Sequence, residues 1–222
     1  MSSSYRRKRL IEVPSVVQIE RPAAADRAQA EQFVRDAFSV AYTARVRQLM
    51  PTLMTLRHDS GRLLAVLGLR EPDATRFYLE HYLDRPVEQV LSEVAGCPVD
   101  RAALIEVGNF AVGAAGGGRW LITALTAYLF TAQKTWAVFT CGPELQNAFR
   151  RLGIDLAELA PADPARLPSD EIADWGTYYD QRPKVMAASV AQSHQVLSGL
   201  YGKECTLHAL WRQALQAGRV AA

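Results

Sequence analysis

Apolar residues recur along the first third of the chain with two spacings, which predict a strand, a helix and a hairpin. Residues 10–20 alternate between apolar and polar positions, as in a half-buried strand. The next segment places six apolar side chains on one helical stripe: Phe33, Val34, Ala37, Phe38, Ala41 and Tyr42. Asp26 and Gln29 have the spacing of a capping box at its start. Residues 52–57 and 62–69 are strand-like runs on either side of the sequence HDSG, which predicts a hairpin.

The middle of the chain predicts a strand–helix–strand–helix unit. The run LIEVGNFAV, residues 104–112, suits a buried strand, and Gly-rich residues 113–118 separate it from a helix that starts at Arg119. Residues 135–141 are again strand-like, and Pro143 and Gly153 fit the start and the end of a further helix. Strands joined by a helix in this way lie parallel in one sheet.

The remaining segments complete an α/β domain. Residues 73–95 predict a helix interrupted at Pro86, and residues 161–183 predict a long loop with an edge strand. Residues 192–217 predict a helical segment, broken near Gly199 and Gly202. The length of 222 residues suits a single domain over residues 1–222. Hydrophobic residues make up 49% of the chain, which is enough for one packed core.

Composition excludes several classes of protein. The net charge of +2 argues against a nucleic-acid partner. Three distant cysteines, Cys97, Cys141 and Cys205, form no metal-ligand spacing, so we expect reduced thiols and no metal site. The most apolar stretch, residues 120–132, is shorter than the ~20 residues that span a bilayer, and nothing resembles a signal peptide. We therefore expect a cytosolic protein without an integral membrane segment, and its Arg- and Ala-rich composition indicates a bacterial source.

Two local features indicate chemistry. The Gly-rich loop that opens a helix suits an anion, because backbone N–H groups and the helix dipole favour a phosphate there. A flexible connector is the alternative reading. Glu106 stands in an apolar strand, where a carboxylate needs a partner such as Arg101 or Arg119, or else has a raised pKa suited to a general base.

Three further groups of polar and aromatic residues are open to two readings. Glu80, like Glu106, has two readings: an acid–base role or a structural ion pair. Asn109 would face the opposite side of a regular strand from Glu106, but a bulge at Gly108 would bring both to one side. An aromatic group either packs in the core or lines a pocket: Trp175, Tyr178 and Tyr179.

Five segments together resemble the family of thermostable hemolysins. They are FYLEHYLDRPVE (77–88), LIEVGNFAV (104–112), VFTCGPELQNAFRRLGI (138–154), ADPARL (162–167) and WGTYY (175–179). These segments cover about half of the chain, in the order typical of that family. The resemblance implies the fold of GNAT-like acyltransferases, a mixed sheet flanked by helices, related to the acyl-homoserine-lactone synthases.

The resemblance also implies a donor site and a reaction. It implies that an acyl donor, acyl-CoA or the acyl-phosphopantetheine arm of an acyl carrier protein, binds as a co-substrate rather than as a tightly bound cofactor. The backbone positions that would hold it are Ala111, Val112, Gly113, Gly116, Gly117, Gly118 and Arg119. The acyl group would pass to a small amine or a similar small-molecule acceptor.

The sequence departs from these relatives at two positions. In many GNAT enzymes a Tyr four residues before the Gly that ends the next helix protonates the leaving thiolate, and here that position is Phe149. Asn109 replaces an Arg of the lactone synthases, which argues against the use of S-adenosylmethionine. The acid–base role therefore falls to Glu106, with Glu80 and Asn109 assisting. Two alternatives remain, a membrane-active hemolysin and a GNAT-fold protein that binds a ligand without catalysis.

Overall fold

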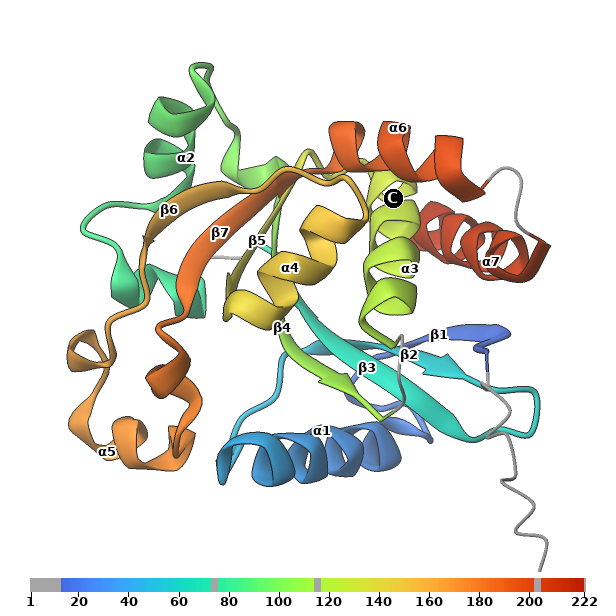
Figure 1. Cartoon of the computed structure of the whole chain (residues 1–222), viewed down its shortest axis with the longest axis horizontal. Coiled ribbons are helices and arrows are strands. Elements are labelled where there is room, and N and C mark those ends of the chain that lie inside the picture. The colour runs from blue at the N-terminus through green and yellow to red at the C-terminus, as the bar shows by residue number, and fades with distance from the viewer. Residues whose placement is uncertain (1–12, 73–75, 114–116, 202–204, 222) are drawn as a thin grey trace, which may run out of the picture.

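Seven strands form one mixed sheet, in the spatial order β1-β2-β3-β4-β5-β7-β6 (Figure 1). The computed structural model describes residues 13–72, 76–113, 117–201 and 205–221. The strands are β1 (Val16–Glu20), β2 (Thr52–Arg57), β3 (Leu63–Arg70), β4 (Leu104–Val112), β5 (Trp136–Cys141), β6 (Ala157–Pro161) and β7 (Lys184–Ser189). Strands β4 and β5 pair in parallel, and the other neighbours pair antiparallel. The predicted parallel pair and the predicted hairpin are both confirmed.

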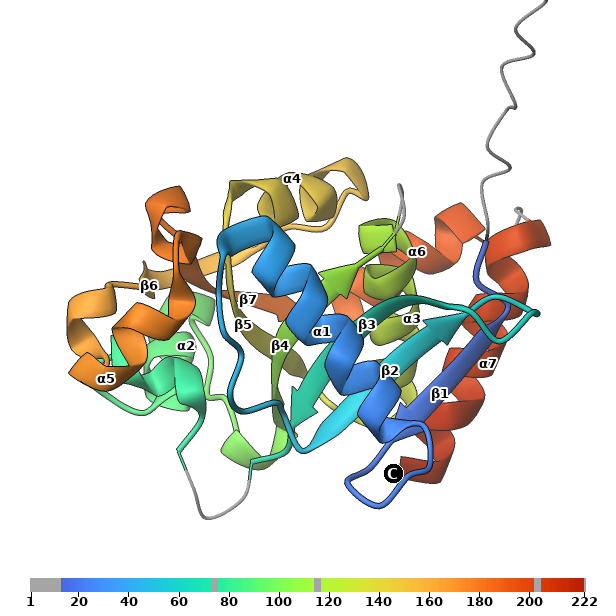
Figure 2. The same cartoon turned by 90° about the horizontal axis from the view of Figure 1, so that it is seen from below.

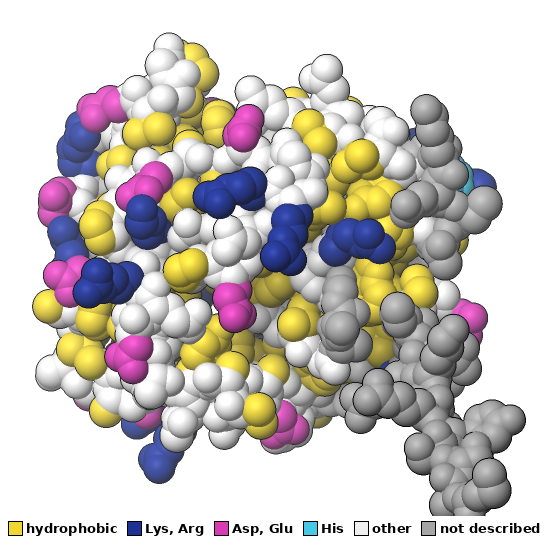
Figure 3. Space-filling model, viewed as in Figure 1, with side chains coloured by type: hydrophobic (Ala, Val, Ile, Leu, Met, Phe, Trp, Pro, Cys, Tyr) yellow, Lys and Arg dark blue, Asp and Glu magenta, His cyan; other side chains and the backbone are white. Residues whose placement is uncertain are grey.

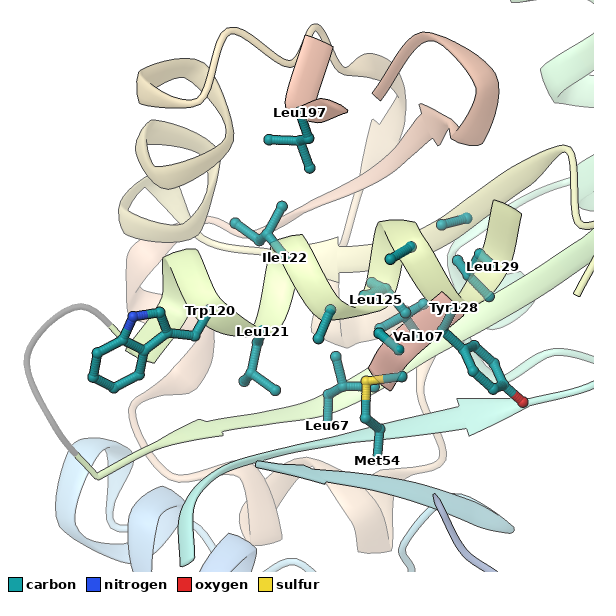
Figure 4. Close-up of a cluster of buried hydrophobic side chains, with 14 of the residues drawn as sticks. Met54, Leu67, Val107, Trp120, Leu121, Ile122, Leu125, Tyr128, Leu129 and Leu197 are labelled. Carbon is teal, nitrogen blue, oxygen red and sulfur yellow. The ribbon is translucent and has the colours of Figure 1, made fainter. Parts of the chain in front are cut away.

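Helices cover both faces of this sheet. One face carries α3 (Gly117–Thr131), α4 (Pro143–Arg151), α6 (Val190–Tyr201) and α7 (Cys205–Ala221). The other face carries α1 (Arg27–Tyr42), which crosses β3 and β4 in Figure 2. The same face also carries the 3₁₀ helix η1 (Tyr78–Tyr82) and α2 (Val87–Ala95). Helix α3 is enclosed, with Leu67 and Val107 of the sheet on one side and Leu197 of α6 on another (Figure 4). The mixed sheet with helices on both faces is the GNAT-like architecture expected from the sequence.

Strands β4 and β5 separate towards their carboxyl ends. Their pairing runs only as far as Val107 and Phe139, whereas β4 continues to Val112. A β-bulge accompanies the separation, because Gly68 of β3 pairs with Gly108 while Val66 pairs with Ala111. The extra residue reverses the alternation of side chains: Val107 and Phe110 both pack towards α3. Of the two alternatives that the sequence left open here, a regular strand and a bulge at Gly108, the structure has the bulge.

The bulge is fixed by Asn109. Its φ of 48° lies in the left-handed region, which Asn tolerates better than most residues with a Cβ atom. Its side-chain Oδ1 accepts a hydrogen bond of 2.8 Å from the backbone N–H of Met50, in the segment that joins α1 to β2. Asn109 thus ties the bulge of β4 to this segment.

The predicted capping box at α1 is wrong. Asp26 stands at the N-cap, but its side chain makes no capping hydrogen bond. Both side chains interact with the guanidinium group of Arg57 instead. This group lies 3.7 Å from the Asp26 carboxylate and donates a 2.7 Å hydrogen bond to the Gln29 side chain. Arg57 is buried on β2, so pairing its charge takes precedence over capping the helix.

Several predicted boundaries also differ from the structure. The first strand is shorter, β1 (Val16–Glu20), and residues 10–12 lie outside the described part of the chain. The predicted helix over residues 73–95 consists of the 3₁₀ helix η1 and a separate α2 after Pro86. Gly199 lies within α6 rather than at a break, and Gly202 lies outside the described residues. Strand β7 was not predicted, because its sequence KVMAAS has no clear alternation.

The backbone of Asn109 generates a stability prediction. Asn109→Val should lower the free energy of unfolding by about 2–3 kcal/mol, because a β-branched residue is strained at this φ and the hydrogen bond to Met50 is lost. Asn109→Gly keeps the conformation and should lose only about 1 kcal/mol. Urea unfolding measures both, with Asn147→Val on the exposed side of α4 as the matched control. Equal losses for Val and Gly at position 109 would contradict the assigned backbone strain.

Candidate active site

A cavity of about 660 Å³ lies where β4 and β5 separate. Its walls come from the carboxyl ends of both strands and the start of α3 on one side. The segment after α1, η1 and the connection between β6 and β7 form the other side. The gap between two separated parallel strands therefore opens into a space that elements from both faces of the sheet enclose.

Glu106 lies at the root of this gap and lines the cavity. Its side chain is only 3% exposed, and Arg70, opposite on β3, forms an ion pair with it at 3.2 Å. Its carboxylate accepts hydrogen bonds of 3.0 Å and 2.8 Å from the backbone N–H groups of Tyr78 and Leu79 in η1. Burial raises the pKa of Glu106, and the two N–H groups and Arg70 counter it only in part. The ion-pair partner is Arg70 rather than the expected Arg101 or Arg119.

Glu80 is a buried carboxylate outside the cavity lining. It receives hydrogen bonds from the backbone N–H groups of Phe77 at 2.8 Å and Val87 at 2.9 Å. Arg101 donates to both of its oxygens, at 2.7 Å and 3.1 Å. Burial works to raise the pKa of Glu80, but the bonds from Arg101 and from the two N–H groups outweigh it and lower that pKa. The contacts of Glu80 hold η1 and the start of α2 together.

Asn109 also lines the cavity, on the same side as Glu106. Met50 closes this part of the wall over two glycines, Gly68 and Gly108, which face each other across β3 and β4. A Cβ atom at Gly68 would stand 2.7 Å from Met50 Cβ, so the close approach of the segment requires Gly there. The structure thus brings Glu106 and Asn109 together, and Glu80 remains behind η1.

The Gly-rich loop meets the cavity at both of its ends. Val112 and Gly118 line the cavity, whereas Ala111 is buried against α1. The N–H of Gly113 donates to the carbonyl of Leu64 at 3.0 Å, so it is already paired within the sheet. Helix α3 begins at Gly117, two residues before the expected start, and Arg119 is exposed in its first turn. Gly116 lies outside the described residues.

Aromatic rings form the wall opposite this loop. Trp175, Tyr178 and Tyr179 line the cavity and also pack against each other, with ring centroids between 5.2 Å and 6.2 Å apart, so both sequence readings hold for them. Sequence reasoning missed Tyr42 and Tyr78, which complete the wall. The sequence pattern placed Tyr42 in the apolar core stripe of α1. Its position at the end of that helix was the signal that could have identified it as a cavity residue.

The β6–β7 connection is docked closely on the end of α1. The backbone N–H of Thr177 donates to the Tyr42 carbonyl at 2.8 Å, and Arg47 pairs with Asp174 at 2.6 Å. Gly176 has a φ of 53°, and a Cβ atom there would stand only 2.1 Å from the Tyr42 carbonyl oxygen. The residue at this contact must therefore be Gly.

Two side chains at the end of β5 and on α4 complete the cavity. Burial raises the pKa of the Cys141 thiol to about 12, so it stays protonated at neutral pH. Phe149 stacks on Phe139 with a centroid distance of 5.2 Å and presents only carbon atoms to the cavity. Phe149 thus occupies the place in α4 that its sequence position suggested.

The molecular surface near the loop is basic. A few dark-blue side chains lie over α3 and α4 in Figure 3, and three arginines on these helices are exposed: Arg119, Arg150 and Arg151. Among the described residues, no cluster of three or more His, Cys, Asp or Glu side chains could hold a metal ion. Within the same residues, no helix has both the length and the apolar character to cross a membrane.

The fold resembles several solved structures that share little of its sequence. The acyl-homoserine lactone synthase LasI gives a TM-score of 0.55 at 16% identity, over 83% of this chain and 94% of its own. BjaI, a CoA-dependent acyl-homoserine lactone synthase, gives 0.56 at 12% identity, over 90% and 99%. FeeM, an N-acyl amino acid synthase from uncultured soil microbes, gives 0.55 at 17% identity, over 81% and 93%. These likenesses confirm the GNAT-like fold.

Sequence comparison identifies the family. No curated protein matches the chain. The sequence profile described as thermostable hemolysin, in contrast, matches residues 20–194, which include every strand except part of β1 and all the described walls of the cavity. The chain therefore belongs to the thermostable hemolysin family.

Proposed function

We propose that the protein is an acyltransferase, which moves an acyl group from a pantetheine thioester to a small amine. The observation that carries this proposal is the separation of β4 and β5 into a cavity that begins at the buried Glu106 and ends at the Gly-rich start of α3. An extended thioester arm fits between two such strands, because the backbone of β4 beyond Val107 no longer pairs with β5 and can bond with its amides. The named solved structures, all synthases of acyl amides, support this reading by their fold.

The donor would enter along the loop between β4 and α3. The start of α3 favours negative charge through its free N–H groups and its dipole, which suits the phosphates of CoA or of a phosphopantetheine arm. Val112 and Gly118 would contact the arm, and the exposed Arg119 would contact its phosphates. Backbone of Ala111, Gly113, Gly116 and Gly117 completes the proposed donor site. Arg150 and Arg151 extend the basic surface towards a carrier protein, if one delivers the acyl group.

Glu106 would accept the proton of the attacking amine. It is the carboxylate at the root of the gap, and its raised pKa brings it closer to the pH at which a base is effective. Asn109 would shape the same wall, through its bond to Met50. Glu80 would act indirectly, because it fixes η1, whose N–H groups hold Glu106. The residues at the cavity and the acyl donor together supply every group that this proposed reaction uses.

Gly118 tests the donor site. A Cβ atom there would meet only Phe110, at 3.9 Å, so Gly118→Leu has room to fold while its side chain narrows the cavity. Calorimetry should show CoA binding weakened by about tenfold or more, since the arm loses space rather than one contact. Gly199→Leu, in α6 with no atom of the described residues within 4 Å of its Cβ, is the matched control and should bind CoA normally. Equal CoA affinity in both variants would place the donor elsewhere.

Glu106 and Glu80 form a matched pair for the acid–base test. In either Glu→Gln variant the new amide must face a backbone N–H group or an arginine, so each should lose about 1–3 kcal/mol of stability. At a temperature where both remain folded, Glu106→Gln should lose about a hundredfold or more in kcat, and Glu80→Gln much less. If kcat falls in both variants in proportion to their loss of stability, the result would assign Glu106 a structural role.

The pH dependence supplies an independent check on Glu106. A base must be ionised, so kcat/KM should fall as the pH is lowered through the Glu106 pKa. Because that pKa is raised, the fall should begin at a higher pH than an ordinary Glu, near 4.5, would give. The acidic limb should be absent from the residual activity of Glu106→Gln. A limb that persists unchanged in this variant would belong to another group.

A further inference from the structure

The thioester sulfur in the proposed site would lie beside the carboxyl end of β5, where a departing thiolate needs a hydrogen-bond donor. Helix α4 offers none there, because Phe149 presents only a ring. The Cys141 thiol lies at the same strand end, but a thiol is a weak donor. The hydroxyl groups that line the cavity are therefore the candidates for the hydrogen-bond donor to the sulfur.

Tyr178 is the tyrosine whose hydroxyl reaches β5. It approaches from the β6–β7 connection and donates to the backbone carbonyl of Thr140 over 3.4 Å, a long bond that leaves the hydroxyl available to a stronger acceptor. Tyr42 packs edge-on against its ring, with the centroids 5.3 Å apart, and Trp175 packs against it at a tilt, also at 5.3 Å. The position of the hydroxyl is therefore set by packing rather than by this one bond.

The other tyrosines of the cavity are engaged elsewhere. The Tyr78 hydroxyl donates to Glu171 at 2.9 Å and accepts from the Trp175 indole at 3.2 Å. The hydroxyls of Tyr82 and Tyr179 bond to each other at 2.5 Å. Tyr42 contributes its ring to the packing of Tyr178.

We propose that the Tyr178 hydroxyl donates a hydrogen bond to the sulfur of the acyl donor and stabilises the thiolate as it leaves. This inference rests on the proposed acyl transfer. It gives the β6–β7 connection a catalytic group that the sequence alone had left open between packing and pocket.

The step balances with the groups already present. The amine nitrogen attacks the thioester carbonyl carbon and passes one proton to the Glu106 carboxylate. As the carbon–sulfur bond breaks, its electron pair stays on sulfur, and the hydrogen bond from Tyr178 stabilises the thiolate. The proton held by Glu106 passes through solvent to this thiolate. The products are an amide and a free thiol.

Electrostatics suits a hydrogen-bond donor at this position. Burial raises the pKa of Tyr178 well above its ordinary value, and the neighbouring Tyr179 and Cys141 raise it further. The hydroxyl therefore keeps its proton over the working pH range and serves as a donor rather than as a base.

The test uses CoA itself as the probe of the sulfur position. In the wild-type protein, a hydrogen bond from Tyr178 stabilises the thiolate of bound CoA, so this thiol should titrate about one pH unit lower than in Tyr178→Phe. Iodoacetamide labelling across a pH series measures the titration. Mass detection of the alkylated CoA separates it from the protein's own three cysteines. CoA affinity should stay within about threefold in Tyr178→Phe, because one contact to sulfur contributes little to binding CoA.

Tyr201→Phe is the matched control, since it removes a buried hydroxyl from α6, away from the cavity lining. Its bound CoA should titrate as in the wild type. If wild-type protein and Tyr178→Phe bind CoA and its thiol titrates identically, this inference fails and the proposed function stands. If neither CoA nor holo acyl carrier protein binds the wild-type protein, the proposed function fails, and the role of Tyr178 fails with it.

Discussion

The buried carboxylate of Glu106 is the constraint on which the site depends. An ionised carboxylate removed from water costs on the order of several kcal/mol unless other groups compensate it. Here the compensation comes from Arg70 on β3 and from two backbone N–H groups of η1. The need to satisfy one carboxylate therefore joins the sheet to η1 at the point where β4 and β5 begin to separate. Glu80 serves the same arrangement from behind, since its four hydrogen bonds keep η1 in the conformation that presents those N–H groups.

The separation of the strands has a second cause in the bulge at Asn109. The extra residue turns Phe110 towards α3 and Ala111 towards α1, so the end of β4 packs on different layers from those that a regular strand would reach. Met50 then fits over Gly68 and Gly108, and brings the segment after α1 against the strand. The gap thus results from packing on both faces of the sheet, which explains why one cavity is lined by residues from both.

Much of this arrangement follows from local sequence signals. The parallel strands and the hairpin were predictable, because each follows from a pattern within one continuous stretch of the chain. The bulge at Gly108 was one of two alternatives, because it depends on the pairing of β4 with the distant β3. The polar partners were not predictable: Arg57 draws Asp26 and Gln29 from their capping positions, and Arg70 pairs with Glu106 across the sheet. Both partners come from the β2–β3 hairpin, and long-range pairing of this kind leaves no periodic pattern. Tyr78 escaped notice for the same reason, since only its bonds to Glu171 and Trp175 show which side of η1 faces the cavity.

The connection between β6 and β7 has a consequence for how such a site can diversify. It contributes Trp175, Tyr178 and Tyr179 to the cavity, yet it leaves and rejoins the sheet at the edge strand β6 and its neighbour. Its fixed anchor is Gly176 against the end of α1, where no larger residue fits. Insertions or exchanges on either side of that anchor would reshape the pocket without disturbing the order of the strands. A family built in this way can change the shape of its pocket by replacing one connection, while the rest of its core is inherited unchanged.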